Sequence, residues 1–196
     1  YGSGGPYHSS SVESVLIQIK GIKVVYPSNA ADMKGLFKAA YYDPNPVVIL
    51  EHKGLYWSKV PETETARRPE PSSDYILPLG KADLRIQASD ENIKLGNTCV
   101  IITYGMGVHW SLSAAKKFKD RIAIVDLRSL HPLDFETCVS QVKLHSKCLI
   151  VTEESADGSF AQSLAARLQM ECFESLDAAI KVIGAENLPA IPLNSI

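Results

Sequence analysis

The residue best suited to chemistry in this sequence is His8, which follows Tyr7 in a glycine-rich loop. Residues 1–6 hold three glycines and a proline, a composition typical of a loop whose backbone can approach a ligand closely. Serines at 9–11 and the acid Glu13 predict a helix that begins directly after the histidine. A helix N-terminus favours negative charge, and an imidazole beside it can transfer a proton near neutral pH. The pattern indicates a proton-transfer site at His8, with a surface histidine that has no catalytic task as the alternative.

The other candidates for chemistry give weaker patterns. The remaining histidines show no metal-ligand spacing with one another or with the cysteines, which argues against a zinc site and favours ordinary polar roles. They are His52, His109, His131 and His145. Glu153 and Glu154 follow a predicted strand, where ligands often bind in open α/β sheets, but a structural or interface role is the favoured interpretation. The turn at 105–107 lacks the third glycine of a dinucleotide-binding fingerprint, and a tight turn explains it.

Alternating strands and helices must position these residues. Apolar runs at 99–104, 121–125 and 148–152 are typical of buried strands, and helical periodicity appears at 108–118, 134–144 and 158–169. The segment 126–134 ends a strand, turns at a proline and offers Asp134 as a helix cap. Such alternation predicts a mostly parallel sheet covered by helices on both faces.

The N-terminal third predicts one β-α-β unit with a right-handed crossover. Strands are expected at 22–26 and 47–50, joined by a helix for which Asn29 and Asp32 resemble a capping box. Residues 58–78 are rich in proline and polar residues without apolar periodicity, which indicates a linker between two domains. A last apolar piece at 180–183 is expected to form an edge strand.

Composition excludes several classes of function. The formal net charge is -2, which gives no electrostatic reason to expect nucleic acid or an anionic membrane as a partner. The sequence has no apolar run near the roughly 20 residues that span a bilayer, and no signal-peptide pattern. Its four cysteines form no Cys-x-x-Cys pair, and we expect them to be reduced thiols of a cytoplasmic protein. A start without Met, inside a glycine-rich loop, leads us to expect a piece of a longer protein.

Several segments, in the same order along the chain, resemble one enzyme family. They are 4–9 (Gly-Gly-Pro-Tyr-His-Ser), 43–51, 77–82 (Leu-Pro-Leu-Gly-Lys-Ala), 102–105 and 126–134. Together they resemble the beta subunit of the thiamine-diphosphate-dependent decarboxylating component of 2-oxo acid dehydrogenase complexes, within the wider transketolase-like group. Such enzymes remove CO₂ from a 2-oxo acid and pass the acyl group to a lipoyl arm, and the cofactor carries the carbanion chemistry.

The resemblance implies a domain plan. Residues 1–60 would be the C-terminal half of a pyrimidine-binding domain, 61–79 a linker and 80–196 a transketolase C-terminal domain, both domains being three-layer α/β/α units. The family's cofactor-activating glutamate lies upstream of the matched region, and its diphosphate and magnesium motif is absent from this sequence. Thiamine diphosphate and magnesium are therefore expected to bind the full enzyme, and the isolated chain to bind neither tightly and to be inactive.

The resemblance also implies site residues. His8 falls on the family's active-site histidine, a proton donor during acyl transfer, and Tyr7 would pack at the same mouth. The family's histidine precedes a Ser-Gln pair, whereas Ser9 and Ser10 follow here.

A second site that the resemblance implies is one for a monovalent cation such as potassium. Family members hold this ion with backbone oxygens near the loop that matches Ala40 to Asn45. Asp43 and Asn45 match the family at this loop, and hard oxygen ligands suit such an ion.

The implied partners are an alpha subunit or a fused alpha-like segment, a second copy in a dimer, and the lipoyl acyltransferase component. The substrate would be a branched-chain 2-oxo acid, such as 2-oxoisovalerate, or pyruvate. Two alternatives stay open. Residues 80–196 could serve as a scaffold for dimerisation and acyltransferase docking, and a transketolase or a deoxyxylulose phosphate synthase would share the fold.

Overall fold

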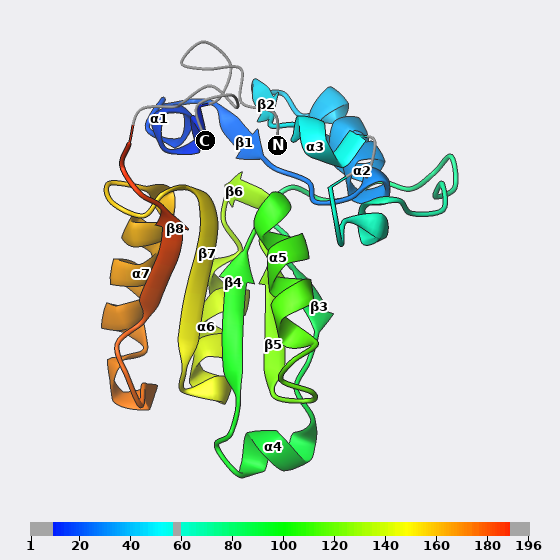
Figure 1. Cartoon of the computed structure of the whole chain (residues 1–196). Helices are drawn as coiled ribbons and strands as arrows, with labels where there is room; N and C mark the ends of the chain where they lie inside the picture. The colour runs from blue at the N-terminus through cyan, green and yellow to red at the C-terminus, as the bar shows by residue number, and fades with distance from the viewer. Residues whose placement is uncertain (1–9, 57–59, 189–196) are drawn as a thin grey trace.

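The computed structural model describes residues 10–56 and 60–188, which form two α/β regions packed against each other (Figure 1). The first region contains α1 (Glu13–Ile17), β1 (Lys23–Val25), α2 (Ala30–Tyr42), β2 (Val47–Ile49) and α3 (Lys53–Tyr56). Strands β1 and β2 run parallel, with Lys23 opposite Val47 and Val25 opposite Ile49. The predicted β-α-β unit is confirmed, and Asn29 caps α2 by accepting the backbone N–H of Asp32 at 3.0 Å.

A third strand completes this sheet and comes from far along the chain. Strand β6 (Ser129–His131) pairs antiparallel with β1, giving the order β2-β1-β6. The interpretation of 126–134 as a strand end, a turn at the proline and a helix cap therefore missed β6. Three residues without an apolar pattern carry no local strand signal, because pairing with a distant strand is what stabilises them.

The proline-rich segment after α3 packs along α2. It includes η2 (Glu64–Ala66) and brings Leu77 into an apolar cluster with Val25 and Leu36. The backbone N–H of Leu77 donates to the carbonyl of Gly35 at 3.1 Å. A Cβ at Gly35 would lie 2.6 Å from the ring of Tyr75, so only glycine allows this close approach. The predicted linker thus contributes to the core of the first region.

The second region is a five-stranded sheet in the order β3-β5-β4-β7-β8. Only the β3–β5 pair is antiparallel, and β8 is the edge strand that the sequence predicted. Its elements are β3 (Asp83–Ile86), α4 (Asp90–Lys94), β4 (Cys99–Thr103), α5 (Met106–Ala115), β5 (Ile122–Asp126), α6 (Phe135–His145), β7 (Cys148–Ser155), α7 (Phe160–Glu171), η3 (Phe173–Ser175) and β8 (Lys181–Ala185).

Alternation along the buried strands separates two helical layers. Ile101 of β4 lies in the apolar cluster of Ala115 from α5, whereas its neighbour Ile102 lies in the cluster that Val142 of α6 and Leu168 of α7 help to form. One helix thus covers one face and two helices cover the other, which is the predicted three-layer α/β/α arrangement. Asp134 caps α6, as predicted, by accepting the backbone N–H of Thr137 at 3.3 Å.

The four cysteines are free thiols on or beside the second sheet, three of them buried. Burial raises the pKa of Cys138 to about 12, so this side chain behaves as a small apolar group. No helix in the described part of the chain combines the length and the apolar character that crossing a bilayer requires.

Helix α1 starts later than the serines suggest. It begins at Glu13, and its N-cap residue Val12 makes no side-chain capping bond. The expectation that a serine caps it was therefore wrong among the described residues, because Ser10 and Ser11 lie two positions and one position before the N-cap. Helix α1 is held instead by packing against β1 and by hydrogen bonds to the second region.

Candidate functional site

The carboxyl ends of the parallel strands β4, β5 and β7 in the second sheet face the first region (Figure 1). In open α/β sheets this edge is the usual ligand-binding position. Here Tyr104, directly after β4, is buried against Tyr26 of the first region, with ring centroids 5.6 Å apart. Its hydroxyl lies 2.7 Å from the Thr152 hydroxyl on β7. Protein side chains therefore occupy the edge where such a sheet commonly binds a ligand.

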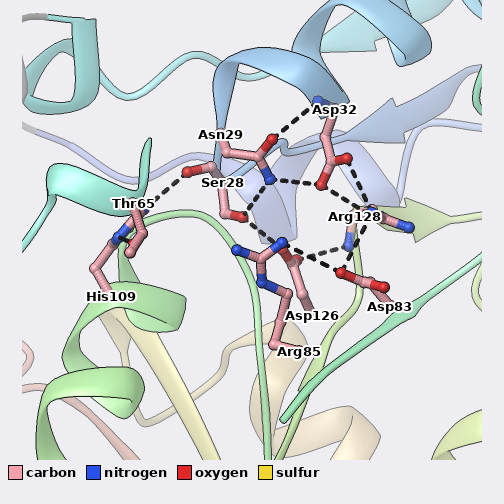
Figure 2. Close-up of polar contacts among 9 residues, drawn as sticks. All are labelled: Ser28, Asn29, Asp32, Thr65, Asp83, Arg85, His109, Asp126 and Arg128. Atoms are coloured by element: carbon pink, nitrogen blue, oxygen red, sulfur yellow. Dashed lines mark hydrogen bonds and ion pairs between the residues drawn. The ribbon is translucent and has the colours of Figure 1, made fainter. Parts of the chain in front are cut away.

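A network of polar side chains joins the two regions at this edge, and Figure 2 shows its members. Ser28 Oγ donates to Asp126 Oδ2 at 2.5 Å, and the backbone N–H of Arg128 donates to Asp126 Oδ1 at 3.1 Å. Burial raises the pKa of Asp126 to about 6. Asp126 is the last residue of β5, so its carboxyl group joins the end of this strand to Ser28 of the first region.

Arg128 forms the charged centre of this network. It donates from Nε and Nη2 to the two carboxylate oxygens of Asp32 at 2.8 and 2.9 Å, and Nη2 also lies 3.3 Å from Asp83 (Figure 2). The side chains of Arg128 and Asp32 are only 12% and 4% exposed. A two-pronged pair of this kind fixes orientation as well as distance, so it locks the N-terminus of α2 to the second region.

His109 of α5 also joins the two regions, and its imidazole ring is neutral. Its Nε2 donates to the carbonyl of Ser28 at 2.8 Å, so Nδ1 is left to accept the hydroxyl of Thr65 at 3.2 Å. Burial lowers the pKa of His109, in agreement with a ring that carries one proton. This is one of the ordinary polar roles that the sequence predicted for the histidine.

His52 makes a second contact across the boundary. The backbone N–H of Gly54 donates to Nδ1 at 3.1 Å, which makes Nε2 the protonated nitrogen, and Nε2 donates to Glu153 at 3.0 Å. Glu153 therefore has the interface role that the sequence analysis favoured.

The neighbouring Glu154 binds α1. It accepts the hydroxyl of Ser14 at 2.6 Å and the backbone N–H of Ser14 at 3.3 Å. The Ser14 hydroxyl in turn accepts the backbone N–H of Phe160, the first residue of α7, at 2.6 Å. Both glutamates at the carboxyl end of β7 thus hold the first region in place.

Glu13 is the buried carboxyl group of this boundary. It is 2% exposed, and its Oε1 atom has no hydrogen-bond partner. Burial, with the charges of Glu154 and Glu153 nearby, raises its pKa to about 7. The folded protein therefore favours the neutral acid.

Glu13→Gln is expected to flatten the pH dependence of stability. Because folding raises the pKa of Glu13, the contribution of this group to the free energy of unfolding is complete at acid pH and is lost as the pH rises through about 7. A shift from the usual value of 4.5 corresponds to a loss of about 3 kcal/mol at pH 9. Urea unfolding of the full-length wild-type and Glu13→Gln proteins between pH 5 and 9 measures this loss of stability. Glu136→Gln, an exposed first-turn glutamate, is the control, and an identical pH slope in both variants would contradict the assignment.

The residues that the sequence proposed for chemistry are only partly described. Tyr7 and His8 lie outside the described residues, as does Ser9. Asp43 follows α2, and its backbone N–H donates to the carbonyl of Ala40 at 3.3 Å. Its carboxylate accepts hydrogen bonds from Lys23 Nζ at 2.5 Å and from the backbone N–H of Asn45 at 3.0 Å. The hydrogen bond from Lys23 lowers the pKa of Asp43. Both carboxylate oxygens of Asp43 are therefore engaged by Lys23 and Asn45.

A small cavity lies beside the network, at the carboxyl ends of β1 and β2. Its volume is about 210 Å³, below the roughly 300–1,000 Å³ of typical small-molecule sites. Its lining is mainly apolar, with Met33, Leu55 and Ala66, and includes the polar residues Asn29 and His52. Within the described residues, no group of three or more His, Cys, Asp or Glu side chains is arranged to hold a metal ion.

Two family models match the chain. The transketolase C-terminal domain matches residues 91–194, and the transketolase pyrimidine-binding domain matches residues 1–58. A solved structure titled split gene transketolase, inactive beta4 tetramer, aligns with a TM-score of 0.66 at 20% identity, covering 93% of this chain and 55% of that one. This structural likeness supports the fold.

Among curated proteins, the 2-oxoisovalerate dehydrogenase subunit beta of Bacillus subtilis is 38% identical over 192 residues, which is 96% of this chain and 54% of that protein. The pyruvate dehydrogenase E1 component subunit beta of the same organism is 36% identical over 181 residues, covering 91% and 51%. The chain thus spans about half the length of these relatives.

Proposed function

This chain belongs to the transketolase family, and on that basis we propose that it forms part of the beta subunit of a thiamine-diphosphate-dependent 2-oxo acid dehydrogenase. The observation that carries the proposal is the similarity to the beta subunit of 2-oxoisovalerate dehydrogenase, which extends over 96% of the chain. The proposed reaction is the oxidative decarboxylation of a 2-oxo acid with transfer of the acyl group to a lipoyl arm. A branched-chain 2-oxo acid is the first candidate substrate, and pyruvate is the second because of the similarity to a pyruvate dehydrogenase subunit.

The proposed division of labour assigns proton transfer to His8 during acyl transfer, with Tyr7 at the same mouth. Thiamine diphosphate supplies the chemistry that cleaves the bond to the carboxylate. The family's diphosphate and magnesium motif is missing from this sequence, and we therefore propose that other parts of the enzyme supply that site. A potassium ion at the loop of Ala40, Asp43 and Asn45 remains part of the proposal.

The proposed partners follow from the relatives. An alpha subunit would complete the cofactor site, a second copy would form a dimer, and a lipoyl acyltransferase would receive the acyl group. The domain boundaries proposed are 1–60, 61–79 and 80–196, the last being the C-terminal domain.

A scaffold function is the second candidate for residues 80–196. It is favoured by the occupied edge of the second sheet, where Tyr104, Asp126 and Glu154 contact the first region instead of a ligand. The two proposals are compatible, since one domain can position another that carries the catalytic histidine.

Two half-reactions test the function. The full-length protein, purified with its alpha partner, should decarboxylate 2-oxoisovalerate with an artificial electron acceptor and should acylate a lipoyl domain. Absence of both reactions with both candidate substrates would contradict the proposal.

His8→Ala in that enzyme is expected to slow acylation of the lipoyl domain by about 100-fold, within the range that general acid catalysis contributes. Decarboxylation with the artificial acceptor should change much less, because it does not use the proposed proton donor. His131→Ala is the control, since His131 lies on exposed β6 surface. An equal loss in both half-reactions would assign His8 to binding or folding.

A further inference from the structure

We propose that the boundary between the two regions contains a pH-sensitive joint, in which α1 lies against the end of β7 while Glu13 is neutral and separates from it when Glu13 ionises. The joint consists of Glu13, its neighbour Ser14, and the glutamates Glu153 and Glu154 at the carboxyl end of β7. The inference goes beyond the proposed reaction and does not depend on it.

Glu13 occupies a position that suits a neutral acid better than a carboxylate. It is the first residue of α1 and is 2% exposed. Its Oε1 atom has no hydrogen-bond partner among the described residues. An ionised oxygen at such a place has lost its water without gaining a donor, which is far more costly than burying a neutral group.

The charged groups that act on Glu13 are acids. Ser14, the next residue, donates its hydroxyl and its backbone N–H to the two oxygens of Glu154 at 2.6 and 3.3 Å. Glu153 accepts a hydrogen bond from His52 at 3.0 Å. Burial, followed by the charges of Glu154 and Glu153, raises the pKa of Glu13 to about 7. Ionised Glu13 therefore repels the two glutamates to which the first region is fastened.

The two elements that pack against α1, β1 and α7, do not offset this repulsion through their described cations. Lys23 of β1 is paired with Asp43 at 2.5 Å. Arg167 of α7 lies over the ring of Phe135, 4.3 Å from its centroid. Both cations thus have partners of their own, away from Glu13.

Two buried phenols complete the surroundings of Glu13. Burial raises the pKa of Tyr26 and of Tyr104, and the charge of Glu13 adds to both shifts. The two rings pack with centroids 5.6 Å apart, and both phenols stay neutral near physiological pH. Tyr26 and Tyr104 therefore supply no charge that could compensate an ionised Glu13.

Helix α1 is short enough to separate without unfolding the rest of the protein. It has five residues, far fewer than the roughly 12–15 at which an isolated helix becomes marginally stable. Its N-cap residue contributes no side-chain bond. Leu16 and Ile17 pack against the main core cluster, whereas Val15 is 67% exposed. Short elements of this kind open locally at a lower free energy than the core strands.

Hydrogen exchange of the full-length protein at pH 5 and pH 8, corrected for intrinsic rates, tests the joint. The reporters are the amides of Ser14 and Phe160, which donate to Glu154 and to the Ser14 hydroxyl across the boundary. Between the two pH values, their protection should fall at least tenfold more in the wild type than in Glu13→Gln, which cannot ionise. A pKa raised from 4.5 to about 7 is sufficient for such a difference.

Glu136→Gln is the matched control, because Glu136 is an exposed glutamate in the first turn of α6 and its loss should leave the wild-type behaviour unchanged. An equal fall in protection in the wild type and in Glu13→Gln would overturn the proposal. Should Glu13→Gln fail to fold, Glu13→Met, which also lacks a titratable group, takes its place in the same comparison.

Urea distinguishes separation of α1 from unfolding of the whole protein. At pH 8, exchange of the Ser14 and Phe160 amides should depend only weakly on urea at low concentrations, because separation of a short helix exposes little surface. The amides of Ile101 and Ile102 in β4 should respond more steeply, since they become accessible through larger openings. The same urea dependence for both groups of amides would show that α1 leaves β7 only when the protein unfolds, and would overturn the joint.

Discussion

Replacing Arg128 with methionine is expected to lower the free energy of unfolding by about 3–5 kcal/mol, the usual cost of removing one partner of a buried ion pair. The variant leaves the carboxylate of Asp32, whose side chain is 4% exposed, without its cation. It also removes the contact with Asp83 across the boundary. Arg128 has a φ of 57°, and methionine carries the same backbone cost there, so the measured difference reports the lost ion pairs.

Urea unfolding of the full-length protein measures this effect. Lys147→Met is the control, because it breaks an exposed ion pair with Asp177 at 2.7 Å and should cost less than about 1 kcal/mol. Adding Asp32→Asn to Arg128→Met should recover part of the loss, because the uncompensated charge disappears. An Arg128→Met cost no greater than that of the control would show that water reaches Asp32 and that the network does not join the two regions.

Local sequence information predicted the second sheet well. Strands β4, β5 and β7 are short runs of buried apolar residues. The helices α2 and α6 follow the capping residues Asn29 and Asp134, each of which accepts a backbone N–H three positions later. Each of these signals lies inside one element, so a single sequence contains it. Strand β6 was missed because its pairing partner β1 lies about a hundred residues earlier.

The boundary residues were harder to predict for the same physical reason. Ser14 and Glu154 lie 140 positions apart, and neither residue type shows a periodic pattern. The clue that the sequence did hold is positional. Asp126 and the pair Glu153–Glu154 directly follow the apolar runs that predicted buried strands, so their carboxyl groups had to lie at one edge of the sheet. The sequence could not show that this edge meets another domain of the same chain.

That arrangement explains how the second sheet positions the first region. The same sheet edge that commonly binds a ligand in open α/β folds here binds the first region through Asp126, Glu153 and Glu154. The boundary therefore fixes the position of α1 relative to the second sheet.

Gly105→Ala is expected to destabilise the protein by about 3 kcal/mol or more, through two independent effects at the same boundary. Gly105 is the N-cap residue of α5, with φ 53° and ψ -127°, a conformation in which any residue with a Cβ is strained by about 1–3 kcal/mol. The added Cβ would also lie 2.9–3.1 Å from ring atoms of Tyr26. Overpacking of this kind typically costs a further 1–3 kcal/mol.

Gly96→Ala separates the two effects, because Gly96 also has a positive φ, 67°, but no atom would lie within 4 Å of its Cβ. It should cost about 1–2 kcal/mol from the backbone alone. Near-ultraviolet circular dichroism should change only in Gly105→Ala, since Tyr26 packs against Tyr104 with centroids 5.6 Å apart. Equal costs and equal spectra for the two variants would mean that Tyr26 moves aside freely. In that case the aromatic contact would not hold the two regions together, and the polar contacts of Arg128, His52 and Glu154 across the boundary would do so.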